Sequence, residues 1–444
     1  MPVSPARATA FDILLRVAQQ DAYAGELLHS ERLNKLDSAD RGLATEIVMG
    51  VLRWQSRLDS AIATNSSRAL AKLDPQVLMA LRIAAYQLLF LSRVPARAAI
   101  HESVELVKRA RKTSAAPFAN AVLRKIAEAG PVVRAAPGEP TSPSRLAEQF
   151  AHPAWLVERW APHFGLRQVE AICRHDQSVP VTSIRVENES VIRELEDQGI
   201  ALARGALLNS ARTVTRGDVA QTRSYREGRV FIQDEASQLV AALVGKGSRI
   251  LDCCAAPGGK TAAIAARNPQ AAIVAAEIHP HRADLLRRRV RAANVEVITG
   301  DITNLQLVSG FDRVLADVPC SGTGTLARNP EIKWRLRPDD LRDLHARQVA
   351  ILHSALQQLS PGGRAVYSTC SLEVEENESV VEEGLHEYRN YRLLDCRAEL
   401  EELQHSGELA VTEIANLLSG PYLRIIPGIH PCDGFFAAVI ERIG

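Results

Sequence analysis

Residues 248–261 (SRILDCCAAPGGKT) decide the fold class of this chain. A short apolar run ends at Leu251 and Asp252, and a Pro-Gly-Gly turn then opens a stretch with helical spacing, residues 261–267. A strand, a glycine turn and a helix in this order bring backbone N–H groups close to a bound ligand. The stretch therefore predicts the first strand-to-helix unit of an α/β sheet, with a ligand at its turn.

Two further apolar runs end at turns that carry cysteine. Residues 313–316 lead into Asp317–Gly322 (DVPCSG), and residues 364–367 lead into Ser368–Ser371 (STCS). In an open α/β sheet, ligands bind in the crevice beyond the carboxyl ends of the strands. If the three runs are parallel strands, then the glycine turn, Cys320 and Cys370 face one crevice, and we expect chemistry there.

The C-terminal half alternates between β-prone and helical runs. The β-prone runs are 249–251, 272–276, 296–298, 313–316 and 364–367, and the helical runs are 234–244, 261–267, 281–293 and 341–359. This alternation predicts a parallel, doubly wound sheet. Residues 434–440 (GFFAAVI) predict a last strand, and residues 179–233 predict a small α+β subdomain with a helix at 190–199.

The N-terminal part predicts helices alone, because apolar residues recur at helical spacing and no alternating strand pattern interrupts them. Asp74 and Pro75 have the form of an N-cap followed by proline at the first helical position. Residues 130–144 are rich in Pro, Gly and Ser and predict a linker. The predicted division is an all-helical domain at 1–129, a linker with short helices at 130–178, an α+β subdomain at 179–233 and an α/β domain at 234–444.

The composition is 46% apolar and 24% charged, which is typical of a soluble globular protein, and 444 residues predict several domains. No apolar run approaches the roughly 20 residues that cross a bilayer, so we expect no membrane association. The seven cysteines lack the paired spacing of a zinc site, and we expect free thiols in a reducing cytoplasm and no metal. The net charge of +1 does not decide whether a nucleic acid binds.

Several basic and aromatic clusters have two possible interpretations. The basic cluster of the helical domain consists of Lys108, Arg109, Arg111, Lys112, Arg124 and Lys125. Composition favours a solvated helix face for it, whereas clustered basic residues also contact RNA phosphates. A solvated face also explains most of the arginines at 282–291. Trp155, Trp160 and Phe164 could stack on bases, but their spacing favours a core.

Two ligand classes compete for the glycine turn. Residues 259–261 resemble the end of a nucleotide-binding P-loop, but Cys254 stands where that loop requires glycine. An adenosyl ligand fits better, since Glu277 ends the next strand, where an acidic residue takes both ribose hydroxyls. Asp301 follows the third strand, where it can accept from the adenine amino group.

Three motifs resemble those of the RNA cytosine-5 methyltransferases: CAAPGGKT at 254–261, DVPCSGTG at 317–324 and TCS at 369–371. With a helical region similar to NusB-type RNA-binding domains, and with QDEAS at 233–237 and DGFF at 433–436, the chain resembles the bacterial RsmB (Sun/Fmu) group. The resemblance covers nearly the whole chain. It implies a Rossmann-like S-adenosylmethionine-dependent methyltransferase domain, preceded by an RRM-like α+β subdomain and a NusB-like all-α domain.

The resemblance also implies the reaction, which is methylation of carbon 5 of a cytosine in 16S ribosomal RNA. Carbon 5 is too electron-poor to take a methyl group directly, and a thiolate that adds to carbon 6 makes it nucleophilic. Spacing leaves open which cysteine attacks. The resemblance assigns attack to Cys370 and help in product release to Cys320, while Asp317 stabilises the ring. Lys260, at the start of a helix, can meet a phosphate or Asp317.

The remaining expectations concern ligands and partners. The expected cofactor-binding residues are Cys254, Ala255, Ala256, Pro257, Gly258, Gly259, Lys260, Glu277, Arg282, Asp301 and Asp317. Residues near the Cys320 turn that are expected to receive RNA are Arg328, Asn329, Lys333, Trp334 and Arg335. Cys173, Cys396 and Cys432 are expected to be inert buried thiols. The chain departs from the family at Glu277, where the family usually has aspartate.

The expected protein is a cytoplasmic monomer whose partner is 16S ribosomal RNA. Two alternatives stay open: a tRNA cytosine-5 methyltransferase with the same catalytic domain, and a non-catalytic RNA-binding or antitermination factor. The NusB-like region speaks against the first alternative. The joint presence of Cys320, Cys370, Asp317 and the glycine turn speaks against the second.

Overall fold

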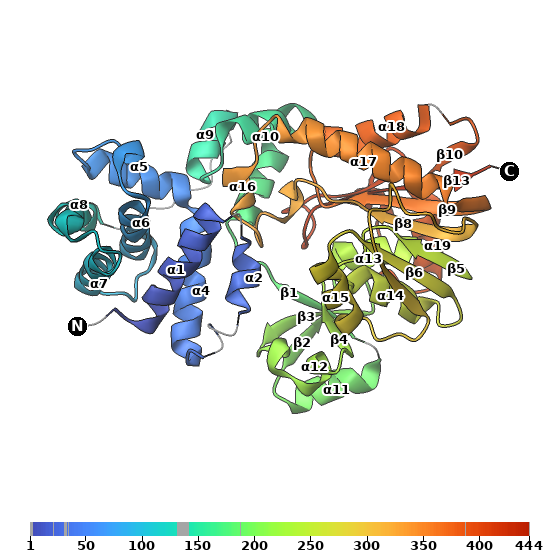
Figure 1. Cartoon of the computed structure of the whole chain (residues 1–444), viewed down its shortest axis with the longest axis horizontal. Coiled ribbons are helices and arrows are strands. Elements are labelled where there is room, and N and C mark those ends of the chain that lie inside the picture. The colour runs from blue at the N-terminus through green and yellow to red at the C-terminus, as the bar shows by residue number, and fades with distance from the viewer. Residues whose placement is uncertain are drawn as a thin grey trace. The chain divides into compact units, whose positions relative to one another are not determined.

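The computed structural model describes residues 3–20, 22–30, 33, 35–130, 142–186, 188–386 and 388–443 (Figure 1). The chain divides into two compact units, of which the first is Met1–Val179 with Leu326–Arg335 and the second is Pro180–Thr325 with Leu336–Gly444. Most of the predicted linker, residues 131–141, lies outside the described residues. The four-part division at 129, 178 and 233 stays a prediction.

The described part of the first unit is helical, as predicted. Its α-helices are α1 (Pro5–Gln19), α2 (Ala24–Leu28), α4 (Ser38–Arg53), α5 (Gln55–Asn65), α6 (Pro75–Phe90), α7 (Ala96–Arg109), α8 (Ala116–Ala129), α9 (Pro143–Gln149), α10 (Ala154–Asp176) and α16 (Ile332–Arg335). The Asp74 side chain accepts a hydrogen bond from the Gln76 N–H and caps α6, and Pro75 is the first residue of that helix. The predicted N-cap is therefore confirmed.

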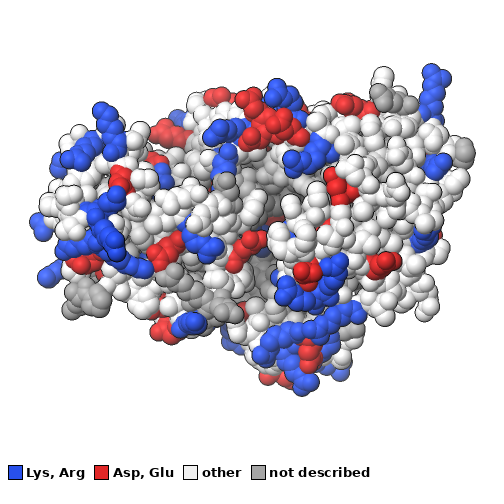
Figure 2. Space-filling view, viewed as in Figure 1, with Lys and Arg blue, Asp and Glu red and all other residues white. Residues whose placement is uncertain are grey.

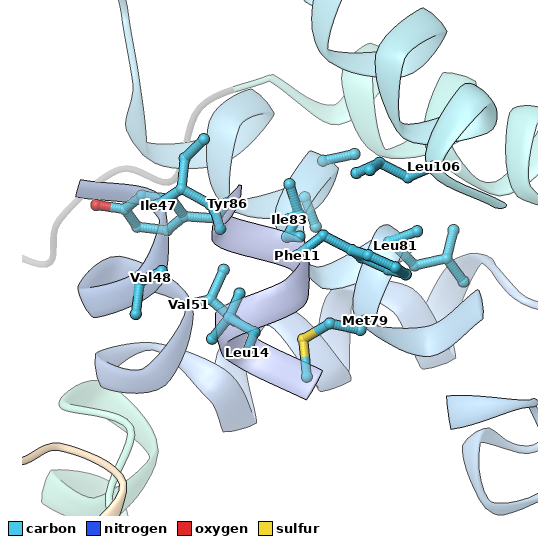
Figure 3. Packing of buried hydrophobic residues seen from close by; sticks show 14 of the residues in the cluster. Phe11, Leu14, Ile47, Val48, Val51, Met79, Leu81, Ile83, Tyr86 and Leu106 are labelled. Carbon is cyan, nitrogen blue, oxygen red and sulfur yellow. The ribbon is translucent and has the colours of Figure 1, made fainter. Parts of the chain in front are cut away.

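The apolar stripes of α1, α4 and α6 meet in one core (Figure 3). Phe11, Leu14, Ile47 and Leu81 are buried there, and each such side chain stabilises the fold by about 1.5–3 kcal/mol. Gly50 lets α4 approach α6, because a Cβ atom at this position would lie 1.9 Å from the ring of Tyr86. Trp160 in α10 is also fully buried, so it serves a core, as its spacing predicted.

The second unit begins with a small antiparallel sheet and its helices. The elements are β1 (Thr182–Val186), α11 (Glu189–Asp197), β2 (Ala201–Arg204), β3 (Ala211–Arg216), α12 (Arg223–Arg226) and β4 (Val230–Ile232), and the strand order is β2-β3-β1-β4. Ile184, Val191, Leu195 and Ile200 join in a core of their own. The predicted α+β subdomain is present, and β2 is an element that the sequence did not reveal, because all four of its residues are at least partly exposed.

A larger sheet follows, with strand order β11-β12-β13-β9-β8-β5-β6-β7 and β10 paired to β13. Its strands are β5 (Arg249–Asp252), β6 (Ala272–Glu277), β7 (Val295–Thr299), β8 (Phe311–Asp317), β9 (Leu359–Thr369), β10 (Tyr391–Leu394), β11 (Leu418–Ser419), β12 (Tyr422–Ile425) and β13 (Phe435–Arg442). Strands β5 to β9 are parallel, as predicted. The expectation of an all-parallel sheet is wrong at one side, where β13 runs antiparallel to β9 and β12. The connection from β12 to β13 is too short for the crossover helix that parallel strands need.

Helices cover both faces of this sheet. They are α13 (Glu235–Leu243), α14 (Gly259–Arg267), α15 (Pro280–Arg289), α17 (Asp340–Gln357), α18 (Glu378–His386) and α19 (Cys396–His405). Leu315 packs in the core that contains α13, α14 and α19, whereas its neighbour Val314 packs in the core that contains α17 and α18. Successive strand residues point to opposite faces, so the arrangement is a three-layer α/β domain. Among the described residues, no helix is both long and apolar enough to cross a membrane.

Candidate active site

The site lies where neighbouring parallel strands end. Strand β5 ends at Asp252, β8 ends at Asp317, and β9 ends at Thr369, just before Cys370. Asp317 pairs in register with Ser368, and β8 lies between β5 and β9. The carboxyl ends of parallel neighbours share one edge of a sheet, so the glycine turn and both cysteine turns meet there, as predicted.

The two cysteines are in contact. The Sγ atoms of Cys320 and Cys370 lie 3.3 Å apart, within hydrogen-bond distance for thiols, and both side chains are half-buried. The hydrogen bond to Cys370 and burial raise the pKa of Cys320 well above that of a free thiol. A raised pKa favours the protonated thiol, and either sulfur can be the donor in this contact.

Lys260 and Asp317 form an ion pair beside these thiols. The Lys260 Nζ lies 2.8 Å from Asp317 Oδ2, and the Ser368 hydroxyl donates to Asp317 Oδ1 at 2.8 Å. The ammonium group also lies 4.8 Å from the centre of the Phe435 ring. Of the two partners expected for Lys260, the structure therefore shows Asp317.

A pocket of about 670 Å³ opens at the same strand ends. The predicted site residues that line it are Cys254, Ala256, Glu277, Arg282, Asp301, Asp317, Cys320 and Cys370. The predicted residues Ala255, Pro257, Gly258, Gly259 and Lys260 are not among its lining residues. They belong to the same turn as Cys254 and Ala256 and to the first residues of α14.

The turn needs glycine at position 258. Gly258 has a positive φ of 103°, and α14 begins at the next residue. A Cβ atom on Gly258 would lie 2.7 Å from Val290 Cγ2 and 2.8 Å from Leu286 Cδ1, so a larger residue would push the turn away from α15. The absent side chain thus lets the turn pack closely against α15.

Two carboxylates stand at the neighbouring strand ends. Glu277 ends β6 and is almost fully buried, and its Oε1 accepts a hydrogen bond from the His279 N–H at 2.9 Å. Arg282 lies 4.0 Å from the same oxygen and donates to the Ala256 carbonyl, so it links Glu277 to the glycine turn. Asp301 follows β7, and its Oδ1 accepts from both the N–H and the hydroxyl of Thr303.

Some residues with a place in the site were missed by sequence reasoning. Glu376 is fully buried and accepts hydrogen bonds from Ser321 and Ser371, which follow the two cysteines. Glu376 stands in an acidic stretch, residues 373–378 (EVEENE). Such a stretch is typical of a solvated helix start, so the sequence did not indicate that Glu376 is buried at the site. Asp252 was predicted at the end of its strand but not as a site residue; it is buried, accepts from the Thr261 hydroxyl at 2.7 Å, and burial raises the pKa of Asp252 to about 7.

The segment expected to receive RNA near the pocket belongs to the first unit. Lys333 is fully buried and donates to the Arg53 carbonyl at 2.9 Å, and the Trp334 indole donates to the Leu52 carbonyl at 2.6 Å. These side chains, together with Arg335, which donates to the carbonyls of Val17 and Ala22, serve packing. The expectation is wrong for Lys333, because its fully buried side chain cannot reach RNA. For Trp334 and Arg335, which are half-buried, it stays a prediction. Arg328 and Asn329 are half-buried in the same segment.

Basic side chains gather on the surface over α12 and α15 (Figure 2). Arg223 and Arg287 form ion pairs with Glu227 and Asp284, in keeping with a solvated face. In the helical unit, Lys108, Arg109 and Lys112 form ion pairs with Glu105, Asp12 and Asp74. Exposed basic residues in these two clusters also include Arg226, Arg288, Arg289, Arg111, Arg124 and Lys125. Both clusters therefore contain neutralised as well as exposed cations.

All seven cysteines are free thiols. Cys173, Cys396 and Cys432 are buried, as predicted, and burial raises the pKa of Cys173 well above its usual value. Cys253 is buried and Cys254 is half-buried, and both line the pocket. In the described part of the chain, no group of three or more His, Cys, Asp or Glu side chains is arranged to hold a metal ion.

Three family models match successive parts of the chain. They are the NusB family over residues 4–128, the ferredoxin-like domain of RsmF/B-like methyltransferases over residues 152–219, and the 16S rRNA methyltransferase RsmB/F family over residues 242–441. Together with the observed elements, these matches confirm the predicted fold class.

Individual relatives match over most of the chain. The probable ribosomal RNA small subunit methyltransferase B of Bacillus subtilis is 32% identical over 100% of both chains. The ribosomal RNA small subunit methyltransferase B of Vibrio cholerae is 32% identical over 91% of this chain and 90% of its own. The solved structure of PH0851 has the same fold, with a TM-score of 0.82 at 24% identity over 100% of both chains.

Proposed function

The chain belongs to the RsmB/F family of ribosomal RNA small subunit methyltransferases, and on this premise we propose that it methylates carbon 5 of a cytosine in 16S ribosomal RNA. The reaction depends on S-adenosylmethionine, as in the family, and passes through a covalent adduct between a cysteine and the base. The observation that carries the proposal is the contact between Cys320 and Cys370 at the pocket.

The residues at the pocket fit S-adenosylmethionine. When bound, this cofactor supplies an electrophilic methyl group. Glu277 presents a carboxylate at a strand end, where it would accept from the ribose hydroxyls, and Asp301, which follows the next strand, would accept from the adenine amino group. Gly258 has no side chain and packs closely against Leu286 and Val290. Arg282 links the turn to Glu277, because it donates to the Ala256 carbonyl and lies 4.0 Å from the Glu277 carboxylate.

Cys370 is the proposed nucleophile. Its thiolate adds to carbon 6 of the cytosine, and ring nitrogen 3 takes a proton from the Lys260–Asp317 pair, so that carbon 5 becomes nucleophilic. After carbon 5 accepts the methyl group, its proton leaves to a base, the bond between sulfur and carbon 6 breaks to release the thiolate, and ring nitrogen 3 returns its proton to the Lys260–Asp317 pair. Asp317 holds the ring and its exocyclic amine during these steps.

Cys320 is the proposed helper. As a protonated thiol in contact with Cys370, it donates a hydrogen bond to the sulfur that carries charge before attack and after release. Hydrogen bonds to an ionised acceptor are about twice as strong as neutral ones. Cys320 thus favours expulsion of Cys370 from the methylated base, so its removal should trap the adduct.

The proposal includes the setting of the reaction. Residues 1–129 bind RNA, and the target cytosine is unpaired or flipped out of its stack so that it can reach the pocket. The enzyme acts as a monomer in the cytoplasm, where the seven free thiols stay reduced. The names of the relatives favour ribosomal RNA over transfer RNA as the substrate.

The test uses wild type, Cys320→Ala and Cys370→Ala with methyl-labelled S-adenosylmethionine, a 16S transcript and, as a control, bulk transfer RNA. Denaturing gels then show any RNA joined to protein. We expect an adduct to accumulate in Cys320→Ala and methylation to vanish in Cys370→Ala. The reverse pattern would exchange the two roles. Methyl label in transfer RNA alone would mean that transfer RNA is the substrate. If no methyl group is transferred although the cofactor binds, the result would favour a non-catalytic RNA-binding factor.

A further inference from the structure

Glu376 lies between the two cysteine turns and forms hydrogen bonds to both. It ends a short 3₁₀ turn (Val374–Glu376) ahead of α18, and its side chain is fully buried. Its Oε1 accepts from the Ser321 N–H at 2.8 Å, and its Oε2 accepts from the Ser371 hydroxyl at 2.5 Å. The Ser321 hydroxyl also donates to Oε2. One carboxylate thus contacts the residue after Cys320 and the residue after Cys370.

A second ring of hydrogen bonds holds Glu376 itself. Gln348 of α17 is fully buried and donates to Glu376 Oε1 and to the Pro319 carbonyl, both at 2.9 Å, so the peptide before Cys320 is held as well. The Tyr367 hydroxyl donates to the Glu376 carbonyl at 2.6 Å. Asn377 accepts from the Thr369 hydroxyl and donates to the Ser371 carbonyl, on either side of Cys370.

We propose that Glu376 is the positioning residue of the active site, which braces the two cysteine turns against each other and thereby keeps the thiols in contact. This inference rests on the proposed function. The two turns follow different strands, β8 and β9, and Glu376 is an acceptor that both turns share. Glu376 also adds negative charge near Cys320 and, after the hydrogen bond to Cys370 and burial, helps to raise the pKa of that thiol.

The chemistry of the contacts favours a carboxylate. Four donors converge on the two oxygens of Glu376, and an ionised carboxyl group accepts without donating. A glutamine that kept its oxygen toward the Ser321 N–H and Gln348 would turn its N–H2 group toward the two serine hydroxyls, which would have to change from donors to acceptors, and the charge-assisted hydrogen bonds would be lost. An aspartate would be one methylene too short to reach both turns.

The test measures thiol geometry and catalysis separately. Phenylarsine oxide binds tightly only where one arsenic atom can bond two neighbouring thiols, with release of water. We expect wild type to bind one equivalent of phenylarsine oxide that the double variant Cys320→Ala/Cys370→Ala does not bind. Intact-protein mass spectrometry in the presence of a competing monothiol measures this binding. In Glu376→Gln this binding should weaken by about tenfold or more. The exposed Glu382→Gln in α18 is the matched control and should behave as wild type.

Catalysis should respond in kcat. A displacement of about 1 Å at a reacting group can lower a rate by about 10²-fold, so Glu376→Gln should lower kcat to that extent while the KM for S-adenosylmethionine changes by less than about twofold. Glu376→Asp should recover only part of the loss. A wild-type kcat in folded Glu376→Gln, or a lowered kcat with unchanged arsenical binding, would overturn the positioning role.

Two features keep the test decisive. If Glu376→Gln does not fold, Ser371→Ala removes one of the four hydrogen bonds and should show the same pattern with a smaller effect, whereas wild-type behaviour would overturn the proposal. The arsenical measurement needs no RNA, so it tests the brace even if wild type transfers no methyl group. In that case only the proposed function fails.

Discussion

Lys260 and Asp317 form a 2.8 Å ion pair that joins the start of α14 to the end of β8. The Lys260 side chain is 12% exposed and that of Asp317 is 26% exposed, so the pair is shielded enough from water to hold a fixed geometry. The pair ties the glycine turn to the strand that leads into Cys320. One contact therefore connects the proposed cofactor wall to the proposed base-binding carboxylate.

If the pair acts as a unit in catalysis, its two members should not contribute independently. We expect Lys260→Met and Asp317→Asn each to lower the single-turnover methylation rate by about 10²-fold, and the double variant to lose much less than the product of the two effects. Rapid-quench measurements on the four proteins of the cycle check this. The exposed Lys246→Met is the control, and strictly multiplicative losses would contradict the coupling.

Glu277 should govern cofactor affinity. Glu277→Gln replaces an ionised acceptor at the β6 end with a neutral one, and hydrogen bonds to charged groups contribute about 1.5–3 kcal/mol. We expect the Kd for S-adenosylmethionine to rise by about 10- to 100-fold in calorimetry, and Glu277→Asp to stay within about fivefold of wild type. Cys370→Ala should bind as wild type does. An unchanged Kd in Glu277→Gln would remove this residue from the cofactor site.

Gly258 should be intolerant of a side chain for two separable reasons. Gly258→Ala places a Cβ atom 2.7 Å from Val290 at a φ of 103°, whereas Gly407 has a φ of 73° and a Cβ atom there would meet nothing within 4 Å. We expect Gly258→Ala to lower the free energy of unfolding by about 1–3 kcal/mol more than Gly407→Ala and to weaken S-adenosylmethionine binding. Urea unfolding followed by far-UV circular dichroism, together with calorimetry, compares the two. Equal losses would mean that the contact with α15 does not matter.

Lys333 should make the first unit more stable as the pH rises. Burial lowers the pKa of Lys333 to about 7, while the unfolded chain keeps this group protonated to about pH 10.4. Between these values the unfolded state binds more protons, so the free energy of unfolding rises with pH by up to about 1.4 kcal/mol per pH unit. Below pH 7 Lys333 is protonated in both states, so it causes no further change of stability with pH.

The comparison with Lys333→Met isolates this effect. All four tryptophans, Trp54, Trp155, Trp160 and Trp334, belong to the first unit, so their fluorescence in urea reports the unfolding of that unit alone. We expect the wild-type curve to gain stability from pH 7 to pH 9.5 relative to Lys333→Met, whereas the exposed Lys125→Met should keep the wild-type slope. Parallel pH profiles for wild type and Lys333→Met would show that Lys333 titrates normally.

Local patterns were sufficient for much of the fold and site. The turn at 254–261, the strand ends at Asp317 and Thr369, and the N-cap at Asp74 were predictable because each depends on residues that are neighbours in sequence. Even the meeting of the cysteine turns followed from a general property of parallel sheets. The motif residues that reach the pocket, such as Cys370 and Asp317, were therefore found in advance.

The sequence by itself determined which segments are helices and which are strands, and at which edge of the sheet the reactive side chains lie. Both depend on the spacing of apolar residues and on turn residues, which are features of neighbouring residues in the chain. Only the tertiary structure decided which distant groups pair. Ser321 and Glu376 are 55 residues apart, and Lys333 reaches across 280 residues to the end of α4. Buried polar groups must find partners wherever the folded chain supplies them, and no local pattern encodes that choice. This is why Glu376 was missed and why Lys333, expected at the RNA, lies in a core.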